Sequence, residues 1–88
     1  RMTWAQDKLE ELIALPYSDP PLEDLGNPPS GTDSAGNLHQ ETISDGSDNY
    51  TISWAVTDDT PITGTKLITV TVTGRGKTTQ VSYVKPEM

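Results

Sequence analysis

Few residues in this chain could do covalent chemistry. It has one histidine, His39, and no cysteine. A Ser–His–Asp triad would have to include this histidine, but no nucleophile elbow lies near it, so a histidine in a surface loop is the better interpretation. Gly76-Lys77-Thr78 matches the end of a phosphate-binding loop, but that pattern also requires a glycine where the chain has Thr71. No two carboxylates form a tuned acid–base pair. We therefore expect neither an enzyme nor a cofactor.

The segment Asp45–Asn49 is the best candidate for a metal site, because it offers several side-chain oxygens close together. Calcium takes about six to eight oxygen ligands, but the EF-hand spacing is not met and no glutamate completes the set. We therefore predict an Asx-rich turn and assign no metal ligand. Asn49-Tyr50-Thr51 matches a glycosylation sequon by pattern alone. Trp54 could stack on a carbohydrate, but its register with Ile52 and Val56 favours the core.

The formal net charge of the 88 residues is −7, and it is unevenly distributed. Residues 1–65 carry twelve acidic and two basic side chains, a net charge of −10, whereas residues 66–88 carry one acidic and four basic side chains, a net charge of +3. A chain this acidic lacks the basic footprint that binds nucleic acid. Opposite charges at its two ends would favour head-to-tail association.

The length predicts a single domain, residues 1–88, and the core must be small because only 32% of the residues are hydrophobic. No run of apolar residues is long enough to cross a membrane, and we recognise no signal peptide. These 88 residues alone are therefore not expected to enter a membrane.

The rest of the chain is expected to be organised around an amphipathic helix over residues 3–15, within an N-terminal segment of residues 1–16. One apolar stripe recurs at helical spacing and consists of Met2, Ala5, Leu9, Leu12 and Ile13. Thr3 with Gln6 fits a capping box. Pro16 should end the helix, because proline disfavours a helical residue before it and lacks the N–H of a further turn.

A second line of residues lies beside this stripe, about a quarter turn away, and consists of Trp4, Lys8, Glu11 and Leu15. One interpretation is a wide apolar face on a small domain. The other is a helix with two neighbours, its own sheet and a surface outside this chain. The second interpretation makes Trp4 and Leu15 candidate residues of a subunit interface.

Residues 17–49 form a long irregular segment that is rich in proline and glycine. Pro21–Leu25, followed by Gly26, could make one helical turn. Asn37–Ser44 could form a short strand. Four apolar residues are expected to anchor the segment to the core: Leu22, Leu25, Leu38 and Ile43.

Residues 50–88 predict a β-meander. Apolar and polar residues alternate over Tyr50–Val56 and Leu67–Thr73. Thr78–Val84 follows with Val81 and Tyr83 on one face, and Gly74–Lys77 forms the turn before it. Three strands with one apolar face need a covering layer, and the helix is available for this.

We therefore predict an α+β fold, in which an N-terminal helix packs on a three- to four-stranded antiparallel meander. The expected core joins residues of the sheet to residues of the helix. They are Ile52, Trp54, Val56, Ile68, Val70, Val72 and Val81 from the sheet, and Ala5, Leu9 and Leu12 from the helix.

Both ends of the chain carry motifs of a known family. The run Ala5–Leu12 reads A-Q-x-K-x-E-E-L, and Leu15-Pro16 follows after a short gap. Lys66–Thr73 forms an alternating strand near the C-terminus. These stretches resemble the minor type IV pilins and related pseudopilins, including the type IV pilus modification proteins. The resemblance covers both ends of the chain but not the middle.

The resemblance implies a pilin-like globular domain and a structural role in a type IV pilus or type II secretion filament. Family members carry a processed hydrophobic segment ahead of this helix, and these 88 residues contain none, so we expect a soluble truncation. The full-length form would be anchored in the inner membrane of a bacterium, with this domain facing the periplasm before assembly. Its partners would be other pilin or pseudopilin subunits. The alternative from the residues is a small extracellular binding or adhesion module, with calcium as an optional ligand.

Overall fold

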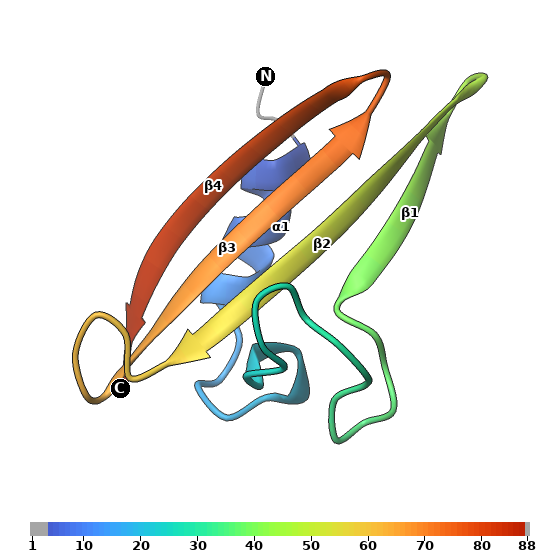
Figure 1. The fold of residues 1–88 in the computed structure, drawn as a ribbon. Helices are drawn as coiled ribbons and strands as arrows, with labels where there is room; N and C mark the ends of the chain where they lie inside the picture. The colour runs from blue at the N-terminus through green and yellow to red at the C-terminus, as the bar shows by residue number, and fades with distance from the viewer. Residues whose placement is uncertain (1–3, 88) are drawn as a thin grey trace.

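The computed structural model describes residues 4–87. Figure 1 shows one sheet with a helix lying across one of its faces. Helix α1 spans Trp4–Ile13, and a short 3-10 helix, η1, spans Pro20–Leu22. The strands are β1 (Gln40–Asp45), β2 (Asp48–Asp58), β3 (Thr65–Gly74) and β4 (Lys77–Pro86). The predicted α+β arrangement of one helix on an antiparallel sheet is confirmed. Met2 and the Thr3 cap of the sequence prediction lie outside the described residues.

The four strands form an antiparallel meander in the order β1-β2-β3-β4. The strand predicted over residues 37–44 is present as β1, which begins at Gln40 and pairs with β2. Gly46, Arg75 and Gly76 take positive φ values of 67°, 53° and 72° in the two tight hairpin turns. Glycine adopts this conformation without steric cost, which explains its position at both turns.

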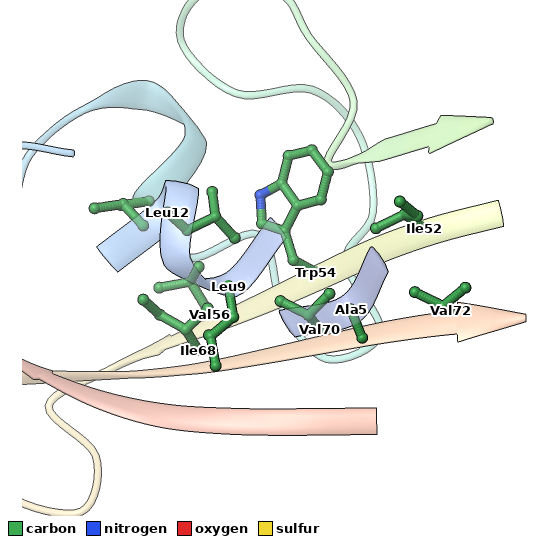
Figure 2. Packing of buried hydrophobic residues seen from close by; sticks show 10 residues of the cluster. Ala5, Leu9, Leu12, Ile52, Trp54, Val56, Ile68, Val70 and Val72 are labelled. Carbon is green, nitrogen blue, oxygen red and sulfur yellow. The ribbon is translucent and has the colours of Figure 1, made fainter. Parts of the chain in front are cut away.

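The core lies between α1 and the face of the sheet that the helix covers, as predicted (Figure 2). The predicted residues that are buried there are Ala5, Leu9, Leu12, Ile52, Trp54, Val56, Ile68, Val70 and Val72, joined by Leu22. Val81 is only partly buried against this cluster. Tyr83 pairs with Ile68 but is 44% exposed, because it lies on the edge strand β4.

Helix α1 ends two residues earlier than predicted, at Ile13 rather than Leu15. The Leu15 amide donates to the Leu12 carbonyl at 3.2 Å, which tightens the last turn ahead of Pro16. The Lys85 ammonium donates to the Ile13 carbonyl at 2.6 Å and so ties this end of the helix to β4. Within residues 4–87, no helix has both the length and the apolar character that crossing a membrane would require.

The irregular segment between α1 and β1 packs against one end of the sheet (Figure 1). Its helical turn is η1, which lies earlier than the predicted turn over residues 21–25. Leu22 is fully buried, as expected of an anchor, whereas Leu38 is 60% exposed and the prediction for it was wrong. The buried Lys66 ammonium donates to the Leu22 carbonyl at 2.7 Å. A polar contact therefore fixes this segment beside its one deeply buried leucine.

Candidate functional site

The two predicted interface residues, Trp4 and Leu15, lie at opposite ends of the helical region and do not form one surface. Both are partly buried and pack against the domain's own core. The premise that the sheet leaves this second line of the helix uncovered was therefore wrong. Trp4 packs against Tyr50 of β2, and Leu15 packs against the core beyond the end of α1.

Lys8, which lies on the same line of the helix, is the residue of that line that contacts β1. Its ammonium donates to Glu41 of β1 at 2.6 Å and to Glu11 at 2.9 Å, and lies 4.7 Å from the centre of the Trp54 ring. Burial alone would lower the pKa of Lys8, but the hydrogen bonds and charges of the two glutamates raise it above its ordinary value. The side chain is therefore a charged bridge between helix and sheet, not an open surface group.

A concavity on the described surface lies at the end of the domain where α1 begins. It is a cavity of about 450 Å³ beside the β3–β4 turn. Its walls include two aromatic rings, two basic side chains, a valine and a glycine: Trp4, Tyr50, Arg75, Lys77, Val72 and Gly74. We call it the aromatic–basic pocket. An apolar wall with a few polar groups at its rim is the usual make-up of a binding site.

The aromatic wall of this pocket is held in place by close packing. The rings of Trp4 and Tyr50 meet edge to face, with centroids 4.6 Å apart and planes at 61°. A Cβ at position 74 would overlap with the Tyr50 ring, so only glycine lets the ring lie this close to β3. Trp4 therefore contributes to a rigid aromatic wall that involves three separate elements.

The basic side of the pocket comes from the β3–β4 turn. Arg75 is 66% exposed in its side chain and has one carboxylate nearby, that of Asp48 at 3.7 Å. Lys77 is exposed on the other side of the turn. Elsewhere in the described chain, Lys8, Lys66 and Lys85 each donate to an acceptor of the protein. Among residues 4–87, Arg75 and Lys77 are thus the exposed basic side chains, and both line one pocket.

His39 is not the surface residue that the sequence predicted. Its imidazole is buried, with Nε2 at 3.2 Å from both the Asp33 carboxylate and the Pro20 carbonyl. The ring stacks on Trp54 with centroids 5.3 Å apart and planes at 16°. The Trp54 indole N–H donates to the Pro21 carbonyl at 3.0 Å. These contacts fasten the irregular segment to the sheet and bring no nucleophile to the histidine.

Asp33 organises the same segment from within. Its carboxylate accepts hydrogen bonds from the backbone amides of Ala35 and Asn37 at 2.9 and 3.1 Å. Burial alone would raise the pKa of the Asp33 carboxyl, but these amides and the His39 ring outweigh it and hold the pKa below its ordinary value. The residue therefore acts as an ionised clamp of the loop.

The candidate calcium segment is the β1–β2 turn. Asp45 pairs with Asp48 at the end of the two strands, and the Ser44 hydroxyl donates to the Asn49 amide oxygen at 2.9 Å. Asp48 faces Arg75. Among the described residues, no group of three or more His, Cys, Asp and Glu side chains could hold a metal ion. The predicted Asx-rich turn is confirmed as a hairpin turn.

Sequence reasoning missed the pocket because it assigned Tyr50 to the core face and Gly74–Lys77 to a turn. The signal was present in the strand register, which pairs Thr51 with Thr73 and so puts Tyr50 beside Gly74. Comparison of the chain with protein-family models, with curated proteins and with solved structures found no match.

Proposed function

We propose that this chain is the globular part of a minor pilin or pseudopilin, a structural subunit of a type IV pilus or type II secretion filament. One observation carries the proposal: an amphipathic helix lies across one face of an antiparallel meander and begins at an open end of the domain (Figure 1). The motifs Ala5–Leu12 and Lys66–Thr73, which resemble this family, form that helix and the strand β3 beneath it.

The direction of α1 supports this role. Trp4 lies at the rim of the aromatic–basic pocket, beside the β3–β4 turn. A preceding apolar helix in the complete gene product could therefore extend away from the sheet without disturbing the core. Such a segment would hold the precursor in the inner membrane, with this domain in the periplasm, and would later pack in the filament core among other pilin subunits.

The packing of Trp4 and Leu15 changes how their proposed role in subunit contacts can be tested. Since both side chains pack against the core, replacing them with serine should also weaken the domain. Trp4 remains the better interface candidate, because it also lines the pocket at the end from which a preceding helix would leave. A defect in assembly counts for the interface only if the soluble domain of the same variant still melts cooperatively.

The decisive experiment uses the complete gene in its host. The tagged product should appear in the sheared filament fraction on an immunoblot. The same product without its upstream apolar segment should be missing from that fraction while remaining folded. A complete product that carries no apolar segment, or that never enters filaments in a piliated host, would contradict the proposal.

The alternative, a small extracellular binding or adhesion module, is favoured by one observation, the aromatic–basic pocket itself. Its calcium-dependent form makes a separate prediction. Because the β1–β2 turn closes by hydrogen bonding and by the pairing of Asp48 with Arg75, we expect EDTA to leave the melting temperature unchanged. A fall of several degrees, reversed by added calcium, would favour the calcium-dependent module instead.

A further inference from the structure

The end of the domain opposite the aromatic–basic pocket carries an exposed apolar side chain next to a group of acidic ones. The loop between β2 and β3 presents Ile62, whose exposure of 66% makes it the most exposed large hydrophobic residue of the described chain. Asp58 ends β2, Asp59 begins this loop, and Glu87 lies beside them. We call Ile62 with these three acids the acidic knob.

The loop that carries the knob is held in a fixed shape. The Asp59 amide donates to the Thr65 carbonyl at 2.7 Å, and the Asp59 carboxylate accepts from the Gly64 amide at 3.0 Å. The Glu87 amide donates to the Gly64 carbonyl at 2.9 Å and so fastens the end of the chain to the loop. Ile62 therefore stays exposed on a closed loop, and ordering it on binding would cost little.

The charge around the knob is negative. Asp58 pairs with the buried Lys66 at 3.2 Å, which leaves two further exposed carboxylates, Asp59 and Glu87. Burial, followed by the charges of Glu87 and the two aspartates, raises the pKa of the neighbouring Tyr17. The pocket at the other end has Arg75 and Lys77 at its rim, with Asp48 3.7 Å from Arg75, so the net charge of the rim is opposite in sign to that of the knob.

We propose that a second copy of this chain docks its acidic knob into the aromatic–basic pocket, with Ile62 against Trp4 and Tyr50. The two surfaces lie at opposite ends of β3, about 30 Å apart at the rise of a strand. The contact is therefore heterologous, and repeating it joins copies head to tail into an open series. This inference rests on the proposed function for its biological role, as a head-to-tail contact between globular domains of one filament.

The test uses two variants of the 88-residue chain with opposite defects. The pocket variant, Arg75→Asn with Lys77→Gln, removes the positive rim without adding a negative charge, and asparagine tolerates the positive φ of position 75. The knob variant, Ile62→Ser with Asp59→Asn and Glu87→Lys, removes the apolar tip and its charge. Asparagine at 59 keeps both the hydrogen-bond acceptor and the positive φ. Each is compared with the unchanged chain by sedimentation velocity.

We expect the unchanged chain to associate beyond the dimer as its concentration rises, and to dissociate when the ionic strength is raised from roughly 0.02 to 0.5 M. Each variant alone should associate at least about tenfold more weakly. A mixture of the two variants should form a one-to-one dimer and stop there, because one keeps a pocket and the other keeps a knob. An unchanged chain that stays monomeric, or a mixture that does not pair, would overturn the proposal.

Two control variants make the same kinds of change as the knob variant, but at positions outside the knob. Leu38→Ser removes the other exposed large side chain of similar exposure, 60%, from the irregular segment. Asp7→Asn with Glu10→Lys makes the same change of charge on the exposed side of α1. Both should associate as the unchanged chain does, and equal weakening by either would overturn the role of the knob. Failure of the series leaves the filament proposal untouched, because entry into filaments is measured separately.

Discussion

The ring of Tyr50, near the start of β2, packs directly against the backbone of Gly74, at the end of β3. The antiparallel register brings these two residues together, since Thr51 pairs with Thr73. Trp4 then packs against the same ring, with the ring centroids 4.6 Å apart. The N-terminal end of the helix is thus positioned by one glycine on a strand that lies about seventy residues further along the chain.

Replacing Gly74 with alanine should displace the Tyr50 ring and lower the free energy of unfolding by about 1–3 kcal/mol through overpacking. The measurement is urea denaturation of a double-mutant cycle with Tyr50→Ala. In the Tyr50→Ala background the alanine at 74 should cost nothing, because no ring remains to overlap with it. An equal cost in both backgrounds would mean that the two residues do not interact.

Trp54 is the largest residue of the core and is also tied by its indole N–H to the irregular segment. Trp54→Ala should lower the free energy of unfolding by about 3–5 kcal/mol, which threatens a domain of this size. Trp54→Phe keeps most of the apolar volume and should lose about 1 kcal/mol through the missing hydrogen bond to Pro21. A thermal melt that barely moves for Trp54→Ala would show that the core is wrongly placed.

The pH dependence of stability should reveal the Asp33 clamp. The pKa of its carboxyl is held below the ordinary value of 3.8 in the folded chain. The folded state thus favours the ionised carboxylate. The resulting stability is fully present above the ordinary pKa and is lost as the pH falls through the lower, folded pKa. Melting temperatures from neutral pH downwards, with Asp33→Asn as the control, measure this effect.

In that comparison the unchanged chain should be the more stable of the two at neutral pH, and the difference should shrink only below the ordinary pKa of an aspartate. A difference that stays constant into the acid range would show that the Asp33 charge does not stabilise the loop.

Two substitutions of Lys8 separate the stability that its charge contributes from the stability that the packing of its aliphatic stem contributes. Lys8→Met keeps the apolar stem against Trp54 and leaves two glutamates that are about half exposed, at 62% and 49%, and can be rehydrated. Its cost should therefore be about 1 kcal/mol or less. Lys8→Glu buries a negative charge beside two others and should cost at least about 3 kcal/mol. Chemical denaturation measures the free energy of unfolding of both variants. An equal loss of stability in the two would contradict the charged bridge between Lys8 and the glutamates.

Much of the fold could be predicted because local patterns and burial agree in the meander. Ile52, Trp54 and Val56 stand at every second position of β2, and each is buried on the face that α1 covers. Side chains at every second position of a strand point to the same face, so only one orientation of β2 buries these three residues. The Gly76 turn followed from the same logic, because few residues other than glycine accept its conformation.

By itself, then, the sequence determined the helix, the meander and the side chains that join them, because each of these depends on residues close along the chain. Only the tertiary structure decided the burial and the contacts of residues whose partners lie far away in the sequence. His39 became buried because η1 and Trp54 close over it, and Lys8 became buried because Glu41 of β1 and the Trp54 ring lie against it. The pocket likewise needed Trp4, Tyr50 and Gly74 from three elements. Periodicity reports which side of an element is apolar, but not what distant segment packs against it.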